Sequence, residues 1–310
     1  MPIKIPNDLP ASKILKEENI FVMDETRALS QRIRPLKLII VNIMPTKIVT
    51  ETQLLRLLSN TPLQIEVDWL CMESHNSKNT SQEHLMEFYK TFNEIKDNKY
   101  DGLIVTGAPV EKLKFEDVDY WDELTNIFDW ANTNVFSSFF ICWASQASLY
   151  YYYGVEKYQL KEKLTGVYHH HTNPEKMRRR ILRGFDYQFY APHSRYTSVK
   201  KEDIEKADGL ILPGVGAFPS AMKMLEQSGL TETIKTESKK KDKEYHRDLA
   251  KGGDCVMPKN YYKNDDVNDE ILVKWRSHAY LLFSNWLNYY VYQNTPYNLD
   301  DLLKMKTTNK

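Results

Sequence analysis

The chain has 310 residues, enough for one substantial α/β domain or two small ones with a buried core. Lysine plus arginine balance aspartate plus glutamate at 42 each, and no apolar run reaches the roughly 18 to 20 residues of a membrane helix. The three cysteines lack metal-ligand spacing, and the amino terminus lacks the apolar core of a signal peptide. We therefore expect a cytoplasmic protein, and the balanced charge leads us to expect that it binds neither nucleic acid nor membrane.

Short β-rich runs alternate with longer helical runs along the first half of the chain. Strands are predicted at 35–43, 63–70, 100–109 and 135–141, and helices at 50–60, 81–95 and 120–133. This alternation is typical of an α/β fold with a parallel sheet and helices on both faces. Beyond residue 160 the pattern is less regular: an insertion is expected around 165–195 and an aromatic-rich helix at 277–293.

Cys142 stands directly after the fourth predicted strand, in the stretch ICWASQA. Ligands of parallel sheets bind outside the carboxyl ends of the strands. A turn from strand to helix exposes a side chain there, and the helix amino terminus favours thiolate over thiol. Ala144 and Ser145 are small enough for such a turn. The pattern favours a nucleophile over the alternative, a buried structural cysteine.

A second glycine turn, TGAPVE at 106–111, follows the strand predicted at 100–109. Its backbone could help to bind a thioester or an oxyanion. An ordinary turn is the alternative, and the motif alone does not decide between them.

Long stretches of the chain resemble the homoserine O-acyltransferases of the class I glutamine amidotransferase-like fold. They include MPTKIVTETQLLRLLSNTPLQ, DGLIVTGAPVE, ICWASQA, APHSRYT and WRSHAYLLFSNWLNYYVYQ, and the similarity covers about 1–207 and 244–293. The resemblance implies a flavodoxin-like parallel sheet with helices on both faces. It also implies one acyltransferase domain over 1–300, made of an N-terminal extension (1–34), a nucleophile-bearing half (35–160) and a substrate-binding half (161–300), with a tail at 301–310.

The resemblance implies a two-step reaction. In the family, the cysteine matched by Cys142 takes an acyl group from acyl-CoA as a thioester and passes it to the homoserine hydroxyl. Trp143 is then expected to supply an oxyanion-binding N–H. The implied partners are homoserine, acetyl-CoA as a substrate and a second copy of the chain in a homodimer, with no cofactor and no metal.

Four further positions match substrate-site residues of the family. Lys163 in KEKLTGV and Ser194 in APHSR match substrate-binding residues, and Arg247 in EYHRDL matches the arginine that holds the amino-acid substrate. Glu111 matches the position associated with acyl choice, where Glu accompanies acetyl-CoA and Gly accompanies succinyl-CoA. A carboxylate there would repel a succinyl group.

The family's general base is missing from the sequence. It lies in a TGHPEYD motif, where the histidine deprotonates the nucleophile and the glutamate two residues later orients it. Residues 208–243 contain no such motif: Lys235, not histidine, stands two residues before Glu237. The stretch DGLILPGVGAFPSAM instead resembles the glutaminase subunit of imidazole glycerol phosphate synthase. Its GLILP predicts a strand, and 219–230 predicts a helix.

Other histidines are candidates for a substitute base. They are His193, His246, His278 and the run 169–171. Consecutive histidines point in different directions, and no Cys or acidic residue has suitable spacing, so we expect no metal site.

The sequence therefore predicts a homoserine O-acetyltransferase impaired by the missing His-x-Glu pair. A non-catalytic homologue that binds homoserine or acyl-CoA is the main alternative. An O-succinyltransferase and a glutaminase-like hydrolase are lesser alternatives.

Overall fold

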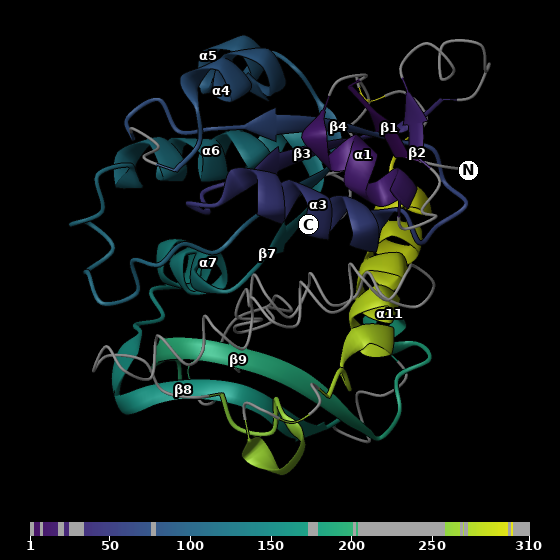
Figure 1. Cartoon of the computed structure of the whole chain (residues 1–310). Coiled ribbons are helices and arrows are strands. Elements are labelled where there is room, and N and C mark those ends of the chain that lie inside the picture. Colours follow the sequence, from purple (N-terminus) through teal and green to yellow (C-terminus); the bar gives the residue numbers. More distant parts are fainter. Residues whose placement is uncertain are drawn as a thin grey trace.

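The computed structural model describes residues 3–6, 9–17, 22–24, 34–75, 79–172, 179–200, 203, 258–266, 269, 272–296 and 299. A parallel sheet with helices packed on it forms one part of this structure, and an antiparallel hairpin forms another (Figure 1). The predicted α/β class is confirmed, as is the parallel sheet with helices on both faces.

The sheet has the strand order β2-β1-β4-β3-β6-β7, and β5 pairs with β4. All of these pairs are parallel. The four predicted strands are confirmed as β3, β4, β6 and β7, and the first 24 residues add two short strands at one edge. The strands are β1 (Ile3–Ile5), β2 (Val22–Asp24), β3 (Leu36–Val41), β4 (Ile65–Leu70), β5 (Tyr89–Lys90), β6 (Tyr100–Val105) and β7 (Val135–Phe140).

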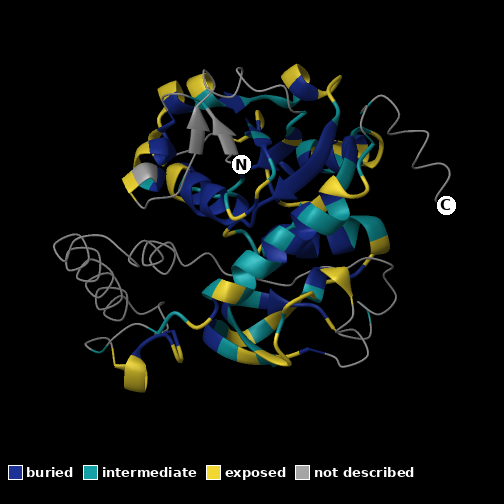
Figure 2. Cartoon of the chain, turned by 90° about the vertical axis from the view of Figure 1, so that its right-hand side faces the viewer, coloured by how far each residue is buried: buried dark blue, intermediate teal, exposed yellow. Residues whose placement is uncertain are grey.

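Each face of the sheet carries its own apolar core. In β3, Leu38 and Ile40 belong to one core and Ile39 and Val41 to the other, because successive side chains of a strand point to opposite faces. Figure 2 shows the buried residues gathered in the sheet and the helices on it. The first core is covered by α1 (Pro10–Glu17), α3 (Lys47–Leu58), α11 (Arg276–Trp286) and the π-helical η5 (Leu287–Tyr292), and the second by α5 (Phe92–Ile95), α6 (Trp121–Asn134) and α7 (Trp143–Tyr153).

Most of the predicted helices are confirmed, but the helix predicted at 81–95 is wrong as a single element. The structure has α4 (Gln82–Phe88), then β5, then α5. The break occurs because Tyr89 takes an extended conformation and pairs with β4. Thr91 and Glu94 then form a capping box that starts a new helix.

The segment 165–195, where the sequence predicts an insertion, lies in a regular element that is separate from the parallel sheet. β8 (Tyr158–His171) and β9 (Gln188–Ser198) form a long antiparallel hairpin, with one irregularity between Gln159 and Leu164. The short helix η2 (Arg180–Leu182) lies in the connection. One face of the hairpin packs on aromatic residues far along the chain: Val167 contacts a cluster with Tyr261, Tyr262 and Trp275. A local pattern does not reveal strands whose core comes from such distant residues.

Helix α11 joins the sheet to the hairpin. Its Trp286 indole N–H donates to Ser137 Oγ on β7 at 3.0 Å, and Asn285 donates to the carbonyl oxygens of Ile181 and Arg183 at 3.0 and 2.7 Å. The ring of His278 lies against Phe189 of β9. The hairpin is therefore held against the same body as the sheet.

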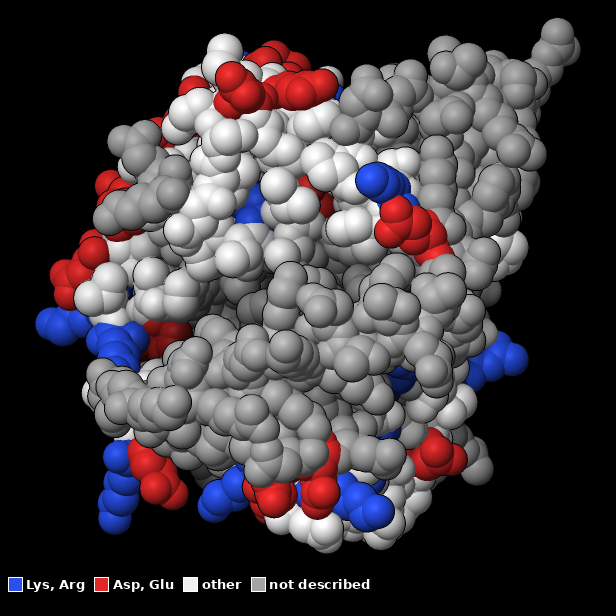
Figure 3. All heavy atoms as spheres, viewed as in Figure 1, with Lys and Arg blue, Asp and Glu red and all other residues white. Residues whose placement is uncertain are grey.

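The strand and helix predicted within 208–243, and the tail at 301–310, lie outside the described residues. Among the helices that are described, none is both long and apolar enough to cross a bilayer. On the face that Figure 3 shows, basic and acidic side chains stand side by side along the rim, as expected for a balanced charge.

Candidate active site

Cys142 occupies the strand-to-helix turn that the sequence predicts. It is the N-cap of α7 and has φ 57° and ψ −122°, a left-handed conformation that L side chains rarely adopt. The Ser145 hydroxyl donates to the Cys142 carbonyl at 2.6 Å, which tightens the turn. Such a backbone costs on the order of 1–3 kcal/mol and is typical of functional sites. The turn therefore holds the thiol at the carboxyl edge of the sheet.

Gly107, in the second glycine turn, lies against this thiol. A Cβ added at Gly107 would come within 2.8 Å of Cys142 Cβ and 3.2 Å of its Sγ. Real Cβ atoms do not tolerate the shorter of these distances, so the turn after β6 approaches the cysteine only because residue 107 has no side chain. The two turns that the sequence treats separately form one site.

Trp143 contributes its backbone N–H to the site. That N–H hydrogen-bonds to Cys142 and lowers the pKa of the thiol. The Trp143 ring points elsewhere: it is buried and packs against Phe115 and Tyr120. The helix start thus aims a donor at the sulfur, where the negative charge of a thiolate would form.

Burial nevertheless raises the pKa of the Cys142 thiol to about 11. The Trp143 N–H opposes this shift, Glu111 adds to it, and Arg195 opposes it. The N–H at the helix start does favour the thiolate, as the sequence predicts. Its effect on the pKa is smaller than the opposite effect of burial, so the thiol form is favoured overall. At neutral pH the group is a thiol in the described structure.

The hairpin forms the second wall of the site. Thr197 on β9 donates from Oγ1 to Oε1 of Gln146 at 2.8 Å in a buried contact, one helical turn after Cys142. Arg195 stands two residues earlier on the same strand. The sequence alone did not single out either residue, since the pattern H-x-R-x-T has meaning only once β9 is known to be a strand.

Lys163 and Ser194 both lie on the hairpin. The Lys163 ammonium stands 5.2 Å from the centroid of the Tyr196 ring, and Lys112 approaches the same ring at 4.1 Å. Lys163 is thereby brought close to the loop that carries Glu111. Ser194 pairs with Thr165 across the two strands. Arg247, the remaining predicted substrate residue, lies outside the described residues.

His170 and His193 of the hairpin pair with each other, and neither is among the groups that act on the charge of Cys142. His193 is buried, and its Nε2 lies 2.8 Å from Nε2 of His170. Burial, Arg195 and His170 lower the pKa of His193 to about 4, so it is neutral at pH 7. His278 lies 3.4 Å from Asp186, and His246 and Glu237 lie outside the described residues.

The triple histidine divides between the two faces of β8. His170 stacks on His193, whereas the rings of His169 and His171 contact each other. Within the described ranges, no three His, Cys, Asp or Glu side chains gather as a metal site.

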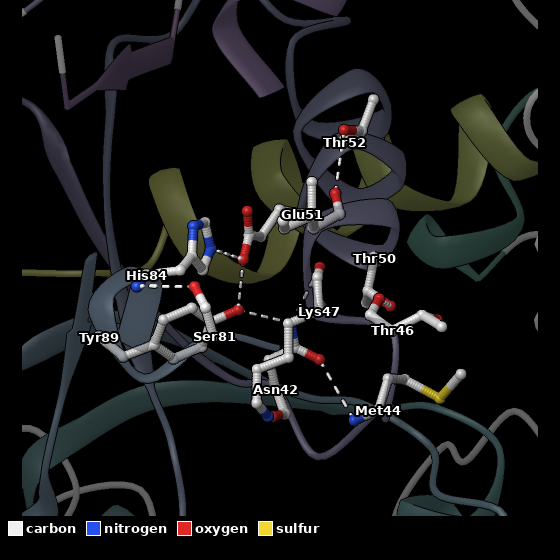
Figure 4. A network of polar contacts seen from close by, with 11 residues as sticks. Asn42, Met44, Thr46, Lys47, Thr50, Glu51, Thr52, Ser81, His84 and Tyr89 are labelled. Atoms are coloured by element: carbon white, nitrogen blue, oxygen red, sulfur yellow. Dashed lines mark hydrogen bonds and ion pairs between the residues drawn. The ribbon is translucent and has the colours of Figure 1, made fainter. Parts of the chain in front are cut away.

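A second buried polar cluster lies at the same edge of the sheet (Figure 4). Lys47 donates to the Asn42 carbonyl at 2.5 Å, and Asn42 Nδ2 donates to the Tyr89 hydroxyl at 2.8 Å. That hydroxyl donates to Glu51 at 2.7 Å, and His84 contacts the same Glu51 oxygen at 2.9 Å. Burial lowers the pKa of Lys47. The cluster ties the start of α3 to β3, α4 and β5, and sequence analysis missed it.

Known proteins with similar sequences identify the family. The pattern of the family described as homoserine O-succinyltransferase matches residues 2–297. The chain belongs to that family. A homoserine O-acetyltransferase of Catenibacterium mitsuokai is 64% identical over 99% of this chain and 100% of its own length. Those of Acetivibrio thermocellus and Phocaeicola vulgatus are 54% and 52% identical, each over 97% of this chain and 100% of its own length.

Proposed function

We propose that this member of the family is a homoserine O-acetyltransferase that carries the acetyl group on Cys142. The observation that supports the proposal most is the position of Cys142, strained at a strand-to-helix turn and pressed against Gly107. A structural cysteine needs neither the strained backbone nor the facing glycine. The names of the full-length relatives agree with this chemistry.

The chemistry takes two steps. The Cys142 sulfur attacks the thioester carbonyl of acetyl-CoA, the carbon–sulfur bond to CoA breaks, and CoA leaves as its thiol with the proton from Cys142. The homoserine hydroxyl then attacks the acetyl carbonyl, the carbon–sulfur bond to Cys142 breaks, and the hydroxyl proton passes to the released sulfur, which restores the thiol. The Trp143 N–H, which hydrogen-bonds to Cys142, is proposed to stabilise the oxyanion in both steps.

Glu111 favours acetyl as the acyl group. Its carboxylate acts electrostatically on Cys142, so a succinyl carboxylate attached to that sulfur would meet a like charge. Lys163, Ser194 and Arg247 are proposed to bind homoserine. No cofactor is needed for either step, and a homodimer is the proposed assembly.

Transfer to homoserine is proposed to be the slow step. The sequence has no His-x-Glu pair, and His193, the buried histidine of the hairpin, has a pKa of about 4. Loss of a general base costs about 10²- to 10⁴-fold in rate. A hydroxyl depends on a base more than a thiol does, because far less of it is ionised at neutral pH.

The test is the intact mass of the protein after incubation with acetyl-CoA, followed by addition of homoserine. An acetyl adduct that is absent in Cys142→Ala and discharged by homoserine is the expected result. Parallel incubations with succinyl-CoA test the acyl choice.

Other outcomes point elsewhere. An adduct that forms and persists for the whole incubation would show a first step without transfer. No adduct with either donor would contradict the proposal and favour a protein that binds homoserine or acyl-CoA without reaction. Release of ammonia from glutamine would favour a glutaminase-like hydrolase.

A further inference from the structure

The docking of the hairpin brings the strand that carries Arg195 against the helix that begins after Cys142. Thr197 of β9 bonds to Gln146 of α7, which fixes one point where strand and helix touch. From Gln146 back to Cys142 the helix rises about 6 Å. From Thr197 back to Arg195 the strand runs about 6.7 Å, and both side chains lie on the same face because their spacing is two residues. Arg195 and Cys142 thus each lie about 6 to 7 Å along their own element from the point of contact, and the guanidinium acts on the charge of the thiol.

Among the described residues, the guanidinium has hydrogen-bond partners at one nitrogen. Arg195 Nη1 donates to Ser198 Oγ at 2.6 Å and approaches the Thr197 carbonyl at 3.4 Å. Nε is buried, and within the described part of the chain it has no hydrogen-bond partner. An arginine held in this way keeps donors that an anion could use.

Arg195 is also a cation without a carboxylate partner among the described residues. The groups that act on its charge are Cys142, Tyr158 and Tyr168, and it in turn acts on His170 and His193. Both of these histidines have pKa values lowered below that of free histidine, so they are neutral at pH 7. The coupling of Arg195 to Cys142 runs in both directions: each group favours the charged form of the other.

The other charge that faces Cys142 is Glu111, from the loop after β6. The carboxylate disfavours the thiolate, whereas the guanidinium favours it. Within the described residues, Arg195 is the one side chain with a positive charge that offsets Glu111 at the sulfur.

We propose that Arg195 activates Cys142: its guanidinium stabilises the thiolate that attacks the acyl donor. Arg195 acts through Cys142 and is therefore a positioning residue, one that the hairpin delivers to the nucleophile. The inference deepens the proposed function and rests on it only for the identity of the nucleophile. In a site whose sequence lacks the His-x-Glu pair, this cation opposes the effect of burial on the thiol and so increases the fraction of thiolate.

The test measures thiol reactivity, not acetyl transfer. Wild type, Arg195→Gln, Arg195→Met and Arg195→Lys are alkylated with iodoacetamide as a function of pH, and peptide mass mapping assigns the modification to Cys142 against Cys71 and Cys255. Lys200→Gln is the matched control, because it removes one exposed positive charge just beyond the same strand. Circular dichroism verifies the fold of each variant.

Arg195→Gln and Arg195→Met are expected to move the half-maximal pH of Cys142 alkylation upward by about one unit, a roughly tenfold loss of rate below that pH. Arg195→Lys should retain most of the reactivity, and Lys200→Gln should match the wild type. Arg195→Met also removes the charge and keeps most of the aliphatic stem. It therefore tests the effect of the charge if Arg195→Gln fails to fold.

Three results would overturn the inference: an unchanged profile in both neutral variants, an equal shift in Arg195→Lys, or an equal shift in Lys200→Gln. None of them involves acetyl-CoA or homoserine. A failure here is therefore distinct from a failure of the proposed acetyl transfer.

Discussion

The two walls of the site are built in different ways. On the sheet side, the backbone defines the site: a left-handed residue at Cys142, a glycine facing it, and an N–H from the next residue. On the hairpin side, side chains define it: Thr197 docks the strand and Arg195 brings the charge. The sheet side determines where the sulfur is, and the hairpin side adds a positive charge that favours its ionisation.

This difference predicts how each wall fails. A change in the backbone wall moves or blocks the nucleophile, so activity falls whatever the pH. A change in the side-chain wall leaves the sulfur in place and shifts its pKa, so that a higher pH restores its reactivity.

The largest effect is expected from Gly107→Ala. Its Cβ would meet Cys142 Cβ at 2.8 Å, so one of the two turns must move. A displacement of this kind costs about 100-fold in the rate of acetyl-adduct formation, measured by intact mass against time. Raising the pH should not restore the rate, because the defect is one of position.

Gly154→Ala is the matched control, at the other end of α7. Gly154 has φ 64°, so alanine is strained there, but no atom lies within 4 Å of the added Cβ. A loss of about 1 kcal/mol in stability with normal adduct formation is expected. Equal loss of adduct in both variants would show that α7 transmits the effect and that contact with Cys142 does not cause it.

The next largest effect concerns the stability of the sheet wall. Asp101 is fully buried at the start of β6 and accepts hydrogen bonds from Arg34, from the Lys37 backbone N–H and from Thr295. Asp101→Ala leaves Arg34 without this partner and should cost about 3 kcal/mol in the free energy of unfolding. Urea denaturation followed by circular dichroism measures it.

The exposed Asp97→Ala provides the comparison, with a change expected within about 0.5 kcal/mol. Similar urea midpoints for the two variants would contradict the claim that the buried Asp101 carboxylate stabilises the fold.

Glu111→Gln should shift the reactivity of Cys142 in the direction opposite to the Arg195 variants. The carboxylate raises the pKa of the thiol, which is about 11, so its removal lowers that pKa and more thiolate forms at a given pH. The half-maximal pH of iodoacetamide alkylation is expected to fall by a few tenths of a unit to about one unit. An upward shift would show that Glu111 acts on Cys142 by some route other than its charge.

The sequence predicts the sheet wall well and the hairpin wall poorly, for a physical reason. The apolar run Leu38, Ile39 and Ile40 and the small residues Ala144 and Ser145 after Cys142 are local patterns imposed by the strand and the turn. The hairpin depends on residues far apart: Val167 packs on Trp275, and Thr197 meets Gln146 across 51 positions. The Glu51 cluster was missed for the same reason, since its partners come from α3, α4 and β5.

The smallest effect is expected from Thr197→Val, which tests the docking of the hairpin without removing the charge of Arg195. Thr197→Val keeps the shape of the side chain and removes the 2.8 Å bond to Gln146, at an expected cost of about 1 kcal/mol. Amide hydrogen exchange should then speed up in β8 and β9 and stay unchanged in β3 and β6, with Thr133→Val, at an exposed position of α6, as the control.

The half-maximal pH of Cys142 alkylation should rise less in Thr197→Val than in Arg195→Gln, because the guanidinium is still present but less firmly held. A shift as large as that of Arg195→Gln would mean that docking, more than charge, sets the reactivity of the sulfur. No shift, together with faster exchange in the hairpin, would mean that Ser198 alone holds Arg195 in place.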